Sequence, residues 1–166
     1  SEHDALWYAI DNKKYSIVKY LIALHTDIKR KDKSGQTLLH RAAYVNNTKI
    51  ISMLLDAGLA IDVKAQDGNT PLMIAASQQK TKAMSVFISK GADIDSKNNT
   101  GNTALSLSII ASKEESVKLL LDAGADIDIR NDKREQAINL AELGGNASII
   151  KLLNQYKEKN KLFGVF

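Results

Sequence analysis

Residues 67–72 read Asp-Gly-Asn-Thr-Pro-Leu, residues 91–95 read Gly-Ala-Asp-Ile-Asp, and two short helical patterns lie between them. The Asp-Gly dipeptide at the start is typical of a tight turn. Thr70 can cap the following helix, and Pro71, the only proline in the chain, suits the first helical position because its missing N–H would be unpaired there anyway. Gly91 can adopt the left-handed conformation that ends a helix. The stretch therefore predicts a helix–loop–helix unit.

The same marks return when the sequence is shifted by 33 residues, and no insertion is needed. A fixed period of this length is the signature of a repeat architecture. The repeated marks are the turn glycine, the capping threonine, the leucine after it, the glycine at the helix end and an aspartate. They are Gly35, Gly68 and Gly101; Thr37, Thr70 and Thr103; Leu39, Leu72 and Leu105; Gly58, Gly91 and Gly124; and Asp62, Asp95 and Asp128.

The period divides the chain into five units, with a first and a last unit that depart from the pattern. We expect a single repeat domain over residues 1–161, followed by a C-terminal tail at residues 157–166. A terminal unit has one face without a neighbour, so we expect its motif residues to depart from the repeat pattern. The tail either folds back onto the last helix pair or continues into a longer chain. The approximate units are residues 1–31, 32–64, 65–97, 98–130 and 131–156.

Composition and the absence of catalytic motifs argue against several classes of function. The 166 residues carry a net charge of +4 and no cysteine, and no apolar run is long enough to span a membrane. The three histidines are not at metal-ligand spacing, and no nucleophile elbow or phosphate-binding glycine loop appears. We therefore predict no enzyme activity, no cofactor and no small-molecule substrate. We expect a cytoplasmic location, with periplasmic residence and secretion left open.

These motifs resemble the ankyrin-repeat family, whose pattern is Gly-x-Thr-Pro-Leu-His-x-Ala-Ala, then a leucine-rich helix, then Gly-Ala-Asp. Residues 68–76 and 91–95 match it closely, whereas residues 37–40 keep the histidine but lack the proline. The resemblance covers about residues 4–155. It implies an all-α solenoid of stacked helix–loop–helix units with hairpin-like connecting loops. It also implies that His40 bonds the neighbouring turn, and that partners bind at the loop tips and the concave surface of the first helices.

Carried over to this chain, the resemblance places a column of basic residues at the loop tips, one for each junction. Stacking would space them roughly 10 Å apart, about one helix diameter. One interpretation is a binding stripe for an acidic partner, and the other is local neutralisation by Asp62, Asp95 and Asp128. The column, which we call the tip row, is Lys31, Lys64, Lys97 and Arg130. The other candidate tip residues are Lys33, Gln36, Gln66, Asn69, Asn99 and Asn102.

The second part of the predicted binding surface lies where the first helix of each inner unit ends. Tyr44 and Ile110 are candidate apolar anchors, since aromatic residues are over-represented among binding hot spots. The alternative interpretation is partial burial of these side chains against the next unit. The candidates on this surface are Tyr44, Val45, Ser77, Gln78, Ile110 and Ala111.

The leading functional hypothesis is a monomeric, non-catalytic module that binds another protein, with an acidic protein surface as one candidate partner. A second hypothesis is binding of nucleic acid or an anionic surface through the tip row. The small net charge and the lack of stacking aromatic residues beside these lysines disfavour it. A third is a regulatory domain of a larger enzyme or a secreted effector.

Overall fold

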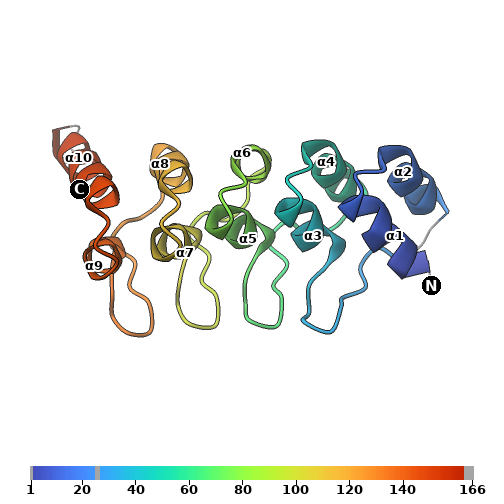
Figure 1. Cartoon of the computed structure of the whole chain (residues 1–166), viewed down its shortest axis with the longest axis horizontal. Coiled ribbons are helices and arrows are strands. Elements are labelled where there is room, and N and C mark those ends of the chain that lie inside the picture. The colour runs from blue at the N-terminus through green and yellow to red at the C-terminus, as the bar shows by residue number, and fades with distance from the viewer. Residues whose placement is uncertain (1, 25–26, 163–166) are drawn as a thin grey trace.

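The computed structural model describes residues 2–24 and 27–162, and this part of the chain folds into ten helices without a strand. The helices form five pairs that stack side by side, with long loops projecting from one edge (Figure 1). The first helices are α1 (Glu2–Asp11), α3 (Leu38–Tyr44), α5 (Pro71–Ser77), α7 (Ala104–Ile110) and α9 (Ala137–Leu143). The second helices are α2 (Tyr15–Ala23), α4 (Thr48–Asp56), α6 (Thr81–Ser89), α8 (Glu114–Asp122) and α10 (Ala147–Leu162). The predicted all-α solenoid is confirmed.

The marks of the opening stretch have the roles that the sequence predicts. Thr70 Oγ1 accepts a hydrogen bond from the backbone N–H of Met73 at 3.3 Å, and Pro71 is the first residue of α5. Gly91 follows α6 with a φ of +84°, a conformation that costs a residue with a Cβ free energy. The unit is therefore bounded by a side-chain cap at one end and a left-handed glycine at the other.

The core runs along the stack as a continuous layer between neighbouring pairs. α5 packs against α3 and α7 as well as against its own partner α6. Alanines such as Ala42 and Ala75 are fully buried, and their small side chains let successive first helices approach closely. The second helices contribute larger groups, including Leu54 and Phe87, which are also fully buried. Stability therefore comes mainly from contacts between neighbours, as expected of a solenoid.

The last unit keeps its shape although it lacks two of the marks. Arg134 stands where the other loops have glycine and adopts a φ of +64°. The backbone N–H of Gln136, at the threonine position, donates to Asn139 Oδ1 at 3.1 Å. Helix α10 continues to Leu162, so the polar residues expected in a tail after residue 156 form its last turns. Residues 163–166, the rest of that expected tail, lie outside the described residues.

Candidate interaction surface

The tip row forms a ladder of hydrogen bonds between successive loops. Lys31 Nζ donates to the carbonyl oxygen of Lys64 at 2.9 Å, and Lys64 Nζ donates to that of Lys97 at 2.7 Å. Lys97 Nζ continues the ladder to the carbonyl of Arg130 at 2.8 Å. All four side chains lie at the surface, so each bond contributes only about 1 kcal/mol or less. The row thus joins neighbouring loops while its charges remain accessible to a partner.

Backbone hydrogen bonds also tie one loop tip to the next. The N–H of Gln66 donates to the carbonyl of Ser34 at 2.9 Å, and that of Asn99 donates to the carbonyl of Asp67 at 3.1 Å. The side-chain amide of Asn99 adds a bond to the carbonyl of Gln66 at 2.8 Å. The tips are therefore one connected strip rather than separate loops.

Asparagine side chains reinforce this strip. Asn98 Nδ2 donates to Asn69 Oδ1 at 2.9 Å, and Asn131 Nδ2 donates to Asn102 Oδ1 at 3.1 Å, across two successive junctions. The predicted tip residues Asn69, Asn99 and Asn102 thus hold the loops together. By contrast, the side chains of the remaining tip candidates make no hydrogen bond or ion pair with the described part of the chain. These residues are Lys33, Gln36 and Gln66.

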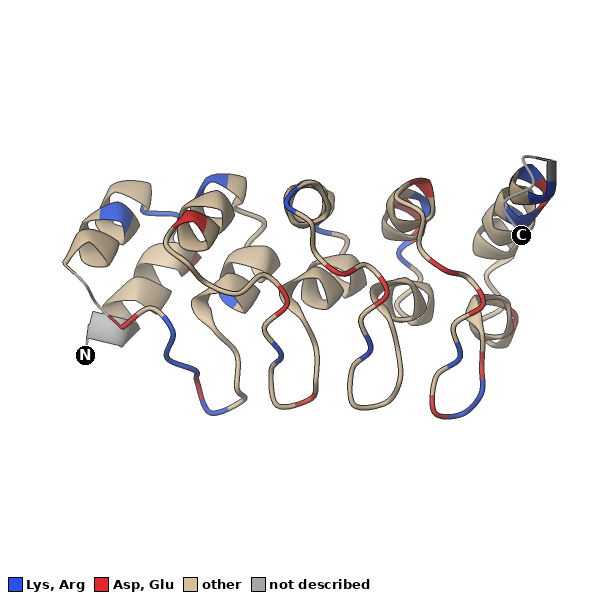
Figure 2. Cartoon of the chain, turned by 180° about the vertical axis from the view of Figure 1, so that it is seen from behind, with Lys and Arg blue, Asp and Glu red and all other residues tan. Residues whose placement is uncertain are grey.

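Within the described part of the chain, the aspartates near the tip row do not pair with its lysines. Asp62 and Asp95 bond the backbone of the next unit, and Asp128 Oδ1 accepts from Gln136 Nε2 at 3.1 Å. The Asp62 carboxylate accepts from the N–H of Asp93 at 3.2 Å, and Asp95 Oδ1 accepts from the N–H of Asp126 at 3.1 Å. Burial raises the pKa of Asp95, although the bond from Asp126 opposes that shift. Acidic and basic segments alternate along the loop edge (Figure 2). The edge therefore has mixed charge and is not a continuous positive stripe.

His40 links two units, as the resemblance implies. Its side chain is fully buried, and its Nδ1 accepts from the backbone N–H of Thr37 at 3.1 Å. Nε2 therefore carries the proton and donates to the carbonyl of Asn69, in the next loop, at 2.9 Å. Burial lowers the pKa of His40 below 6.5, against smaller opposing effects that include the Asn69 bond. The residue acts as a neutral structural bridge.

We expect the substitution His40→Met to remove part of the loss of stability in acid. The pKa of His40 lies below its unfolded value of 6.5, so the unfolded chain binds more protons as pH falls below about 6.5. The stability associated with neutral His40 is present above that pH and is lost toward the lowered native pKa. Each unit of pKa difference corresponds to about 1.4 kcal/mol. Urea unfolding at pH 7.5 and 5.5 measures the difference.

Methionine is a suitable replacement because Met73 occupies the equivalent position in the next unit, with its sulfur 3.4 Å from the backbone nitrogen of Thr70. Between the two pH values, the wild type should lose more unfolding free energy than the variant. Equal losses in both proteins would show that His40 is not responsible.

The predicted residues on the inner surface lie at the ends of successive first helices. Tyr44, Ser77 and Ile110 are the last residues of α3, α5 and α7. Tyr44 is 47% exposed and Ile110 is 54% exposed, so burial against neighbours leaves about half of each side chain accessible. Val45, Gln78 and Ala111 follow as the C-cap residues of these helices. Of these, Gln78 is exposed and the other two are half-buried.

Leu143 extends this series although the sequence analysis did not nominate it. It lies 33 residues after Ile110, ends α9, and is 74% exposed. The 33-residue shift could have found it, because the shift relates it to Tyr44, Ser77 and Ile110. We call these four residues the inner-helix row.

Two cations lie against the ring of Tyr44. Arg41 is 5.3 Å and Lys80 is 5.6 Å from the ring centroid, within the range of cation–π attraction. Arg41 also forms an ion pair with Asp11 of the preceding unit, and its hydrogen bond to Asp11 is the main reason why the pKa of Arg41 is raised. Tyr44 is thus an oriented aromatic group with positive charge beside it.

A stack of helix pairs with connected loop tips along one edge defines a helical repeat solenoid. The family model for ankyrin repeats, in three copies, matches residues 1–67 and 54–131 of the chain. The protein belongs to the ankyrin-repeat family. A search of curated proteins found no match. The pair α9–α10 lies beyond the matched residues but packs against α7 and α8 as a further unit.

Ankyrin repeats are generally protein–protein interaction modules and are typically non-catalytic. Within residues 2–24 and 27–162, no helix has the length and apolar character needed to cross a membrane.

Proposed function

We propose that this chain is a non-catalytic module that binds another protein through its loop tips and its inner-helix row. The observation that carries the proposal is the exposure of Tyr44, Ile110 and Leu143 at equivalent positions of the second, fourth and fifth units. The third unit has the half-buried Ser77 at that position. Large apolar side chains arranged along one edge favour a partner that covers several units at once. A segment with apolar residues spaced along its length fits this arrangement.

The charges beside the apolar residues suggest the chemistry of the partner. The ring of Tyr44 has Arg41 and Lys80 against it, and the tip row contributes further exposed cations. A partner carrying acidic groups next to an apolar anchor would complement this part of the surface. The contribution of the exposed charges is expected mainly in association rate and specificity.

The connected loop tips support binding at low entropic cost. The ladder from Lys31 to Arg130 and the amide bonds of Asn69 and Asn102 hold the loops in place before a partner arrives. Ordering flexible loops on binding costs free energy, and pre-organisation reduces that cost. The structural role of these residues and a role in binding are therefore compatible.

Two double variants test the proposal. We expect Tyr44→Ser with Ile110→Ser, and separately Lys64→Glu with Lys97→Glu, each to weaken binding about tenfold or more. The partner is first identified by capture from the native host and then purified. Affinity is measured by calorimetry, and thermal unfolding shows that each variant remains folded.

The matched control for charge is Lys82→Glu with Lys118→Glu, which changes net charge equally but lies on the exposed surface of α6 and α8. That pair should leave affinity nearly unchanged. If neither test pair weakens binding, or if the control pair weakens it equally, the assignment of the surface is wrong.

A further inference from the structure

The first helix pair has an exposed apolar face. Tyr8 on α1 is 65% exposed, and on α2 Ile17 is 46% and Tyr20 64% exposed. Leu24, just after α2, is more than half exposed as well. Ala5 on α1 is also exposed. We call these five residues the N-terminal face, and it shares no residue with the tip row or the inner-helix row.

In every later unit, the position of Ile17 is buried at a junction with the preceding unit. The equivalent residues are fully buried, and at the second junction the backbone N–H of Ala83 donates to Asn46 Oδ1 of the preceding unit at 2.9 Å. The position of Ile17 therefore faces backward along the stack. The four equivalents, at successive steps of 33 residues, are Ile50, Ala83, Ser116 and Ile149.

Two more positions of the face make contacts to the preceding unit elsewhere in the chain. Arg41, which is equivalent to Tyr8, forms its ion pair with Asp11 of the preceding unit. Lys90, which is equivalent to Leu24, forms an ion pair at 3.7 Å with the aspartate that ends α4. Three of the five positions of the N-terminal face therefore contact the preceding unit in at least one later unit.

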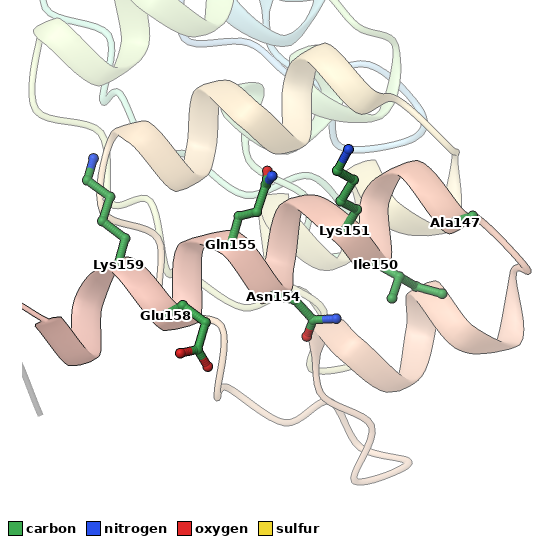
Figure 3. A pocket seen from close by; sticks show the side chains of 7 residues that line it. All are labelled: Ala147, Ile150, Lys151, Asn154, Gln155, Glu158 and Lys159. Carbon is green, nitrogen blue, oxygen red and sulfur yellow. The ribbon is translucent and has the colours of Figure 1, made fainter.

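The opposite end of the stack is different. Glu142 and Asn154 stand where the preceding unit has Ile109 and Leu121, which are almost completely buried against the last unit. The side chains that line the hollow along α10 mostly end in polar groups (Figure 3), although most of the exposed lining is apolar. Its lining residues are Ala147, Ile150, Lys151, Asn154, Gln155, Glu158 and Lys159.

We propose that the N-terminal face is a stacking site for a further helix pair of the ankyrin type, docked in the register of the junctions within this chain. The junction between the first and second pairs shows what such an occupant presents. There the preceding unit contributes Ile10 and Val18, both fully buried. The apolar character of Tyr8, Ile17 and Leu24 matches that chemistry. Stacking of the last unit of a second copy onto this face would bury Glu142 and Asn154, which are exposed here, and is therefore disfavoured.

A fusion tests the proposal. A copy of residues 32–66 is joined directly to Ser1 of the complete chain, which keeps the 33-residue period. We expect the added pair to raise the midpoint of thermal unfolding by about 5 °C or more, because each junction in a solenoid adds stability. The matched control carries the same fusion with Ile17→Lys and Tyr20→Glu, which should abolish the rise.

Three outcomes would overturn the proposal. The first is an unchanged midpoint in the fusion, and the second is an equal rise in the control fusion. The third is dimerisation of the unfused chain, detected by sedimentation at increasing concentration and abolished by Ile17→Lys. That result would identify a second copy as the occupant of the face.

Discussion

Replacing Ile50 with lysine is expected to lower the free energy of unfolding by about 4 kcal/mol or more, whereas the same replacement at Ile17 should change it by less than about 1 kcal/mol. The two residues occupy equivalent positions, 33 apart, in successive second helices. Ile50 is completely buried and Ile17 is about half exposed. An ammonium group at position 50 would be buried without a partner, whereas at position 17 the flexible side chain can reach solvent. Urea unfolding followed by circular dichroism measures both variants.

This pair of variants separates burial from local helix propensity. Both substitutions exchange isoleucine for lysine within a helix of nine residues, so the intrinsic change in propensity is nearly the same. The two sites differ in that a preceding helix pair packs against position 50 and none packs against position 17 within the described part of the chain. Comparable losses of stability at both sites would mean that a neighbour already covers the N-terminal face.

Replacing Gly68 with alanine is expected to cost about 3 kcal/mol, and replacing Gly91 about 1 kcal/mol. Both glycines have similar left-handed backbones, with φ of +79° and +84°. A Cβ at Gly68 would lie 2.6 Å from the backbone nitrogen of Asn99 in the next loop, whereas at Gly91 it would meet nothing within 4 Å. The cost at Gly91 is therefore conformational alone, and at Gly68 a clash between loops is added.

Chemical unfolding of the two alanine variants measures this difference directly, because Gly91→Ala serves as the control for the left-handed conformation. The Gly68 variant should also weaken partner binding more than the Gly91 variant, since it disturbs the bond from Asn99 to Asp67. Equal losses of stability would show that the loops can separate at no cost, contrary to a connected strip of tips.

Much of the local structure was predictable because it depends on residues close together in the chain. Capping by Thr70, the helix start at Pro71 and the left-handed Gly91 each involve at most a few neighbouring residues. The 33-residue period then implied stacking, because a single amphipathic helix pair cannot cover its own apolar side. The bridge from His40 to Asn69 in the next loop spans 29 residues, and it was predicted only because the family resemblance implies it.

The sequence predicted the proposed binding surface only as a set of positions. The shift by 33 residues aligned Lys31, Lys64 and Lys97, but their bonds to carbonyls of the next loop depend on the distance between units. Neutralisation by nearby aspartates was inferred from spacing along the chain, whereas Asp62 and Asp95 bond backbone N–H groups across a junction. The use of the tip row in binding remains a prediction, which the Lys64→Glu and Lys97→Glu double variant tests.

The sequence by itself determined the repeat, its period, the type of each element and the family. These features follow from short-range caps and from a pattern that repeats without interruption. Only the tertiary structure decided which equivalent residues are exposed, because exposure depends on whether a neighbouring unit is present. Ile17 and Ile50 are the same residue in the same pattern, yet one is accessible and the other is buried. Stacking between units, which no single unit encodes, is the physical reason for that difference.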